Sequence, residues 1–165
     1  MQTLFKKRYA FSAGAFLCLA AFGVYASISE LTPIGLWRTV DDKTGKPRSM
    51  VRIYEENGKF FGRVEASLNP ATAGRRCDLC TDERKGQPIV GMMIIRGLTK
   101  DGDEYTGGDI LDPDNGKIYH CKLRVKEQGT KLSVRGYIGA SLFGRSQTWT
   151  RAPLDAVPSA KPVSK

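Results

Sequence analysis

Two cysteines, Cys77 and Cys80, lie close together in a charged stretch of the chain, GRRCDLCTDERKGQP, residues 74–88. A Cys-x-x-Cys pair can be a redox centre, part of a metal site or a structural disulfide. A zinc site needs further ligands, and the one histidine of the chain, His120, directly precedes Cys121 in an alternating segment. Adjacent residues of a strand point to opposite faces, so one site cannot easily use both side chains. We therefore expect no metal here.

The N-terminal end predicts the compartment in which these cysteines work. Residues 1–26 carry Lys6, Lys7 and Arg8 without an acidic residue, then the apolar run AFLCLAAFGV, then small residues ending at Ala26. This is the pattern of a secretory signal peptide, and it is shorter than a comfortable membrane span. We predict cleavage after Ala26 and an exported bacterial product, periplasmic or secreted. No later apolar run has membrane-spanning length.

Export favours a disulfide, because disulfides form and persist outside the cytoplasm. An all-β chain also lacks the βαβ frame and the helix N-terminus that activate a thioredoxin-type pair. A structural disulfide is therefore preferred over a catalytic redox pair. The pairing stays open at this point: Cys77 can join Cys80, or one of them can join Cys121. An unpaired Cys121 would be a buried apolar thiol.

Hairpin signals recur along the chain, whereas helix signals are nearly absent. Tight turns with positive φ are indicated by Asn57-Gly58, Asp101-Gly102, Asn115-Gly116 and Gln128-Gly129. The flanking runs alternate as strands do. We predict strands near 35–41, 48–56, 59–67, 89–99, 103–111, 117–126, 130–139 and 146–151. Eight strands joined in sequence order predict an all-β fold: an up-and-down antiparallel barrel, closed so that no sheet edge is exposed.

One face of each predicted strand is apolar and should line the barrel interior, which either fills with side chains or holds one small ligand. On the second and third strands this inner set is Val51, Ile53, Phe60, Gly62, Val64 and Ala66. The candidate ligand-binding residues of the interior are Val51, Ile53, Phe60, Val64, Met93, Ile95, Tyr119, Cys121, Leu123, Val134 and Ile138. The outer faces carry Arg, Lys and Glu, which excludes a membrane barrel.

Two segments fall outside this pattern. Residues 68–88 form the one long connection, a loop over a barrel mouth that holds both clustered cysteines. Residues 152–165 contain three prolines and no periodicity, which is typical of a disordered tail. We therefore predict a signal peptide at 1–26, one barrel domain at 27–151 and a tail at 152–165.

Composition and motifs exclude several functions. The chain has 26 basic and 17 acidic residues, a formal charge of +9, but the two signs alternate instead of clustering with stacking aromatics. This argues against nucleic-acid binding. DPDNGK, residues 112–117, lacks the distant glutamate of a calcium loop and is a hairpin turn. No nucleophile has a histidine partner and no phosphate loop is present, so the sequence favours a non-enzyme without a cofactor.

The two ends of the barrel resemble those of calycins, the lipocalins and fatty-acid-binding proteins. The first strand opens Gly35-Leu36-Trp37 and the last reads QTWTR, ending in Arg151. In calycins, a first-strand Gly-x-Trp closes the barrel bottom and an arginine of the last strand lies over the indole, which is a cation–π contact. The resemblance implies this structural role for Trp37 and Arg151. It departs from lipocalins in having no helix after the barrel.

A longer resemblance covers nearly the whole chain after residue 26. The segments GLWRTVDDKTGKPRSMVRIYEENGKFFGRV, CDLC…ERKGQPIVGM, GGDILDPDNGKIYHCKLRV and VRGYIG…FGRSQTWTR are similar to a family of small exported bacterial proteins classed as a domain of unknown function. The resemblance implies a lipocalin-like barrel and brings no catalytic residue.

Three functional hypotheses follow. The preferred one is an exported barrel that binds a small apolar or amphipathic molecule. The second is a thiol or disulfide activity of Cys77 and Cys80. The third is a structural or interaction protein of the envelope that uses the loop at 68–88 and the basic surface to contact a partner.

Overall fold

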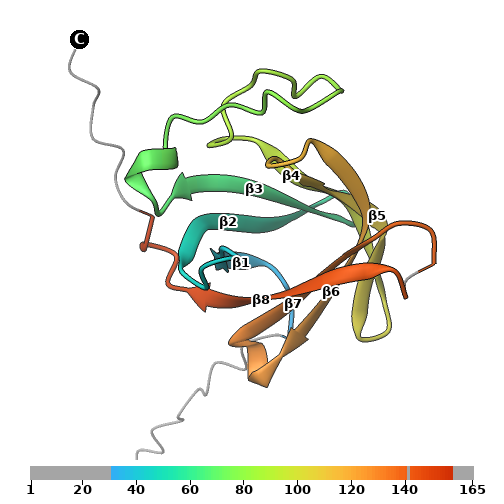
Figure 1. Ribbon diagram of the computed structural model, residues 1–165. Helices are drawn as coiled ribbons and strands as arrows, with labels where there is room; N and C mark the ends of the chain where they lie inside the picture. The colour runs from blue at the N-terminus through green and yellow to red at the C-terminus, as the bar shows by residue number, and fades with distance from the viewer. Residues whose placement is uncertain (1–30, 141, 158–165) are drawn as a thin grey trace, which may run out of the picture.

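The computed structural model describes residues 31–140 and 142–157, and folds them into eight antiparallel strands that close a barrel (Figure 1). Each strand pairs with the next, and the last pairs with the first. This confirms the predicted lipocalin-like up-and-down barrel. Two short 3-10 turns, Pro70–Thr72 and Glu127–Gly129, accompany the strands, and no α-helix occurs in the described residues. The strands are β1 (Gly35–Val40), β2 (Pro47–Glu56), β3 (Lys59–Ser67), β4 (Met93–Asp101), β5 (Glu104–Asp112), β6 (Lys117–Lys126), β7 (Lys131–Tyr137) and β8 (Gly144–Ala152).

The turns that the sequence indicates are present. Asn57 and Gly58 both have positive φ, 52° and 75°, as a two-residue hairpin turn requires. Gly102, Gly116 and Gly129 also have positive φ in their turns. The predicted signal peptide, residues 1–26, lies outside the described residues. The predicted tail is described only as far as residue 157: Ala152 ends β8, while Ala156 and Val157 pack beside it.

Two details of the predicted strands were wrong. β4 begins at Met93, not at residue 89, because the chain turns at residues 90–91 before it pairs with β3. Ala66 does not face the barrel core. The register between β2 and β3 shifts between Met50 and Val51, which turns Ala66 toward Leu36 and Met50 in a separate apolar cluster.

The barrel core is continuous and apolar. Side chains from all eight strands and from the long loop contribute to it. Its members are Trp37, Val51, Ile53, Phe60, Val64, Cys77, Cys80, Met92, Ile94, Ile95, Leu98, Tyr105, Leu111, Cys121, Leu123, Leu132, Val134 and Trp149.

One end of the barrel is closed by Trp37, which is fully buried. The Trp37 indole N–H donates to the Pro33 carbonyl at 2.7 Å, and the Arg151 guanidinium lies 4.2 Å from the ring centroid. Arg151 also donates to the carbonyls of Thr32, Ile34 and Gly129. The calycin-like closure predicted from Trp37 and Arg151 is therefore present.

Gly35 makes this closure sterically feasible. Its φ is +139°, and a Cβ there would lie 2.5 Å from Nη1 of Arg151. A side chain at position 35 would therefore displace the guanidinium from the indole.

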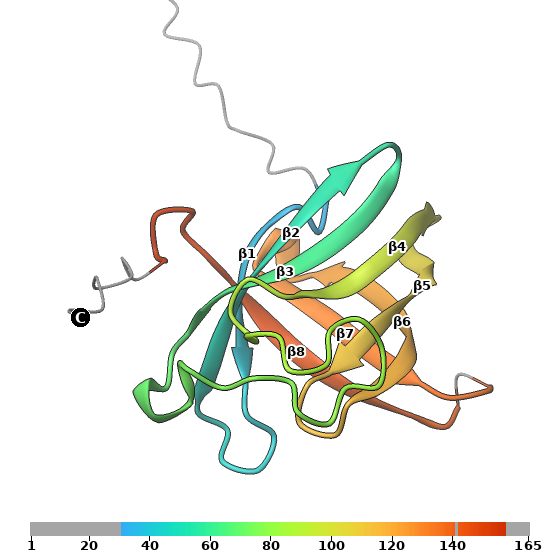
Figure 2. The same ribbon diagram turned by 90° about the horizontal axis from the view of Figure 1, so that it is seen from above.

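Figure 2 shows that the other end of the barrel carries the longer connections. The β1–β2 turn, the β3–β4 loop and the β5–β6 turn gather there, whereas the short β2–β3 turn lies at the opposite end. We call the end with the long connections the mouth.

We expect Arg151→Ala to lower the free energy of unfolding by about 2–3 kcal/mol, because the cation–π contact is lost and three carbonyls lose a charged donor. Urea denaturation followed by circular dichroism measures this. Arg124→Ala is the control, since Arg124 is exposed on β6 and pairs with Glu104 at the surface. It should change stability by less than about 0.5 kcal/mol. Equal effects of the two variants would contradict the structural role of Arg151.

Candidate functional site

A cavity of about 600 Å³ occupies the mouth half of the barrel. This volume lies within the range of small-molecule sites, roughly 300–1,000 Å³. Its inner wall is apolar and comes from β3, β4, β5, β7, β8 and the end of the long loop: Val64, Ile89, Val90, Ile94, Ile110, Leu111, Val134 and Trp149. Tyr119 adds an amphipathic side chain. An apolar wall of this kind suits an apolar part of a ligand.

The sequence-predicted ligand residues fall into two groups. Val64, Tyr119, Val134 and Ile138 line the cavity. Ile138 follows the end of β7 and is exposed at the mouth. The other group does not line the cavity: Val51, Ile53, Phe60, Ile95, Cys121 and Leu123 belong to the packed core, and Met93 is half-buried at the start of β4.

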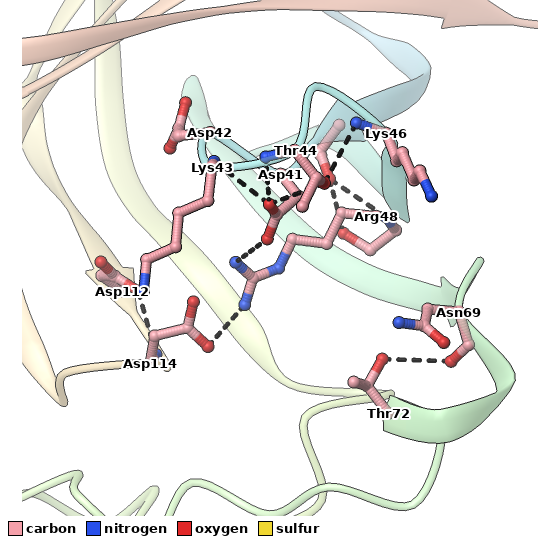
Figure 3. Close-up of polar contacts among 12 residues, drawn as sticks. Asp41, Asp42, Lys43, Thr44, Lys46, Arg48, Asn69, Thr72, Asp112 and Asp114 are labelled. Atoms are coloured by element: carbon pink, nitrogen blue, oxygen red, sulfur yellow. Dashed lines mark hydrogen bonds and ion pairs between the residues drawn. The ribbon is translucent and has the colours of Figure 1, made fainter.

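The mouth of the cavity is polar, as Figure 3 shows in close-up. Arg48 of β2 donates to the Asp114 carboxylate at 2.6 Å, and its other guanidinium nitrogen lies 3.9 Å from Asp41. Arg75 of the long loop donates to the same oxygen of Asp114 at 2.9 Å. One carboxylate of the β5–β6 turn therefore joins β2 to the long loop.

Both carboxylates in this cluster are held in their charged form. The hydrogen bond from Arg48 lowers the pKa of Asp114, with Arg75 adding to the effect. The pKa of exposed Asp41 is lowered mainly by its hydrogen bonds from the Thr44 hydroxyl and backbone N–H. These groups stay ionised at neutral pH.

A second series of polar contacts leads from the cavity wall to the mouth. The Trp149 indole N–H donates to the Gln147 side-chain oxygen at 2.9 Å, and the Gln147 amide donates to Asp42 at 2.5 Å. Asp42 also pairs with Arg145 of β8. These hydrogen bonds tie Trp149, which lines the cavity, to the β1–β2 turn.

The disulfide joins Cys77 to Cys80, which settles the open pairing, and Cys121 is a free buried thiol. Both bonded cysteines are almost fully buried. The loop around them rests on the β5–β6 turn, where Cys77 Sγ lies 3.8 Å from the Pro113 carbonyl oxygen. A Cβ at Gly116 would lie 1.9 Å from the Leu79 carbonyl oxygen. The disulfide therefore shapes a tight turn that packs directly on the β5–β6 turn.

A buried arginine fixes the rest of this loop. Arg84 pairs with Asp82 and donates to the Met93 carbonyl at 3.1 Å, which ties the loop to the start of β4. Within the loop, the Cys77 N–H donates to the Gln87 carbonyl and the Gly86 N–H donates to the Cys77 carbonyl. The loop is thus held by its own hydrogen bonds as well as by the disulfide.

The cysteines offer little support for thiol chemistry. The buried disulfide is not accessible to a partner thiol, and burial raises the pKa of Cys121 far above its usual value, with the charge of Asp109 adding to the effect. His120 packs against Tyr137 on the face opposite to Cys121. No group of three potential metal ligands occurs among the described residues.

Sequence reasoning missed the polar residues of the mouth. Asp112 and Asp114 were assigned to a hairpin turn, which they do form. Their contact with Arg48 joins positions 66 residues apart, which no local pattern reveals. The only available signal was the concentration of charged residues in the turns at one end of the predicted barrel.

The comparisons with known proteins identify the family. Residues 35–151 match the bacterial family described as "Uncharacterized protein conserved in bacteria (DUF2147)", and the chain belongs to this family. No curated protein matches the chain. A solved structure described as "Protein HP1028 from the human pathogen Helicobacter pylori belongs to the lipocalin family" is similar in fold, with a TM-score of 0.66 and 21% identity over 74% of this chain and 84% of that one. No helix among the described residues is long and apolar enough to cross a membrane.

We expect Gly116→Ala to destabilise the protein more than Gly58→Ala. Both glycines have positive φ, +70° and +75°, so both variants bear a similar conformational cost of about 1–2 kcal/mol. Only the methyl group at position 116 meets the disulfide loop, whereas nothing lies within 4 Å of a Cβ at position 58. Urea denaturation should show the difference, and faster reduction of the disulfide should accompany it in Gly116→Ala alone. Equal behaviour of the two variants would disprove tight packing of the loop.

The Cys121 thiol should not react with Ellman's reagent at pH 8 while the protein is folded, since burial disfavours the thiolate. After unfolding in guanidinium it should react fully. The difference between the wild type and Cys121→Ser isolates this one thiol in both states. Rapid reaction of Cys121 in the folded protein would contradict its burial.

Proposed function

We propose that this protein is an exported carrier that binds one small apolar or amphipathic molecule in the mouth half of its barrel. The observation that carries the proposal is the 600 Å³ cavity with an apolar wall and a polar mouth. The closed end filled by Trp37 supports a single entrance at the mouth.

The export part of the proposal rests on the predicted signal peptide at residues 1–26, with residues 27–151 as one barrel domain. The bacterial family and the Cys77–Cys80 disulfide are consistent with it, because disulfides persist outside the cytoplasm. The likeness to the lipocalin-family structure supports the fold on which binding depends.

The polar mouth supports an amphipathic ligand over a wholly apolar one. Buried polar groups on the wall pair with one another: the Thr39 and Ser49 hydroxyls lie 2.8 Å apart, and those of Ser67 and Thr72 lie 3.0 Å apart. These four hydroxyl groups therefore satisfy one another, which lowers the cost of placing an apolar chain beside them.

Binding of the neutral dye N-phenyl-1-naphthylamine tests the proposal, since its fluorescence rises in an apolar site. Val134→Trp should weaken dye binding about tenfold or more, because Val134 lines the cavity and the larger ring fills it. Ser133→Trp is the matched control: the same ring is added one position away, on the opposite face of β7. Equal dye binding by Val134→Trp and wild type would refute binding in this cavity.

A further inference from the structure

The charges of the cavity lie only at its mouth. Among the described residues that line it, the charged ones come from the β1–β2 turn, the start of β2, the long loop, the β5–β6 turn and the start of β8. The inner wall contributes aliphatic and aromatic side chains instead. A polar head of a ligand would therefore lie at the mouth, with its apolar chain inside.

The mouth is electrically balanced although the whole chain has a formal charge of +9. Four acidic and four basic residues line the cavity: Asp41, Asp42, Asp112 and Asp114 against Lys43, Arg48, Arg75 and Arg145. The excess positive charge of the protein is thus located elsewhere. The formal charges of the side chains that line the mouth therefore sum to zero and by themselves favour neither an anion nor a cation.

The individual guanidinium groups are also engaged. Arg48 and Arg75 both donate to Asp114, and Arg145 pairs with Asp42. Lys43 extends toward Asp112 in Figure 3. A carboxylate head that pairs with Arg48 or Arg75 would compete with Asp114 for these donors, and its own desolvation would offset the gain. A zwitterionic head adds no net charge to this balanced set of side chains, and a nonionic head needs no ion partner.

We infer that the ligand is a single-chain amphiphile whose polar head has no net charge, either zwitterionic or nonionic. This inference rests on the proposed function. Taking about 30 Å³ for each non-hydrogen atom, the volume of a water molecule, the cavity holds roughly 20 such atoms. That is enough for one acyl chain and its ester linkage, with the rest of a larger head extending out of the mouth.

Four palmitoyl lipids test the inference, each used below its critical micelle concentration in 0.15 M salt to screen the overall charge. Lysophosphatidylcholine and monopalmitoylglycerol have heads without net charge, whereas lysophosphatidylglycerol and palmitate are anions. Displacement of N-phenyl-1-naphthylamine should require at least tenfold less of the first two than of the anions. If lysophosphatidylcholine and monopalmitoylglycerol displace the dye at similar concentrations, the site selects its ligand by net charge. If one of them displaces it at a lower concentration, that lipid carries the preferred head.

Charge variants at the mouth give a second readout. Asp114→Asn releases Arg48 and Arg75 from their shared carboxylate, so the anionic lipids should bind about fivefold tighter or more. Asp101→Asn makes the same change of charge at the β4–β5 turn, at the other end of the barrel, and should leave all four affinities within about twofold. Arg48→Gln should weaken the anionic lipids further.

The outcomes separate the two proposals. If the dye binds but the anionic lipids displace it as well as the neutral ones, or if Asp114→Asn and Asp101→Asn behave alike, the inference about the head is wrong and the carrier function stands. If neither dye nor lipid binds, the carrier function is wrong and the inference is wrong with it.

Discussion

The closed end of the barrel is the constraint on which the rest of the structure depends. Trp37 fills the interior at the start of β1, and Arg151 holds it from the end of β8, so the first and last strands are joined by side chains as well as by their hydrogen-bond ladder. Arg151 also fixes the residues before β1 through their carbonyls. With one end filled and joined in this way, side chains at the other end need not meet, and a cavity can remain there.

The mouth is held by different interactions, mostly polar and long-range. Asp114 links β2 to the long loop, Arg84 links the loop to β4, and the disulfide turn rests on Gly116. Surface ion pairs are individually weak, about 0–1 kcal/mol each. Their combined effect here is geometric: they position the turns around an opening without filling it. The cavity therefore has an apolar inner wall toward the closed end and polar side chains at its mouth.

The sequence predicted the fold more fully than the site, and the reason is physical. Alternation and positive-φ turns are local, so the strands and their order followed from short segments, whereas the closure by Trp37 and Arg151 followed from the resemblance to calycins. Which inner residues pack and which line a space depends on strand stagger and register shifts. Val134 and Leu123 look alike as inner aliphatic positions and both belong to the core, yet of the two only Val134 also lines the cavity. The mouth cluster joins residues distant in sequence and was not predictable.

The two cysteines show that the chemistry of a Cys-x-x-Cys pair depends on the structure around it. A Cys-x-x-Cys at a helix N-terminus exposes an activated thiolate, whereas here both sulfurs are buried beneath a loop that packs on the β5–β6 turn. Asp114 lies in that same turn and receives Arg48 and Arg75. By fixing the loop against this turn, the covalent bond helps to set where Arg75 and Asp114 lie at the mouth.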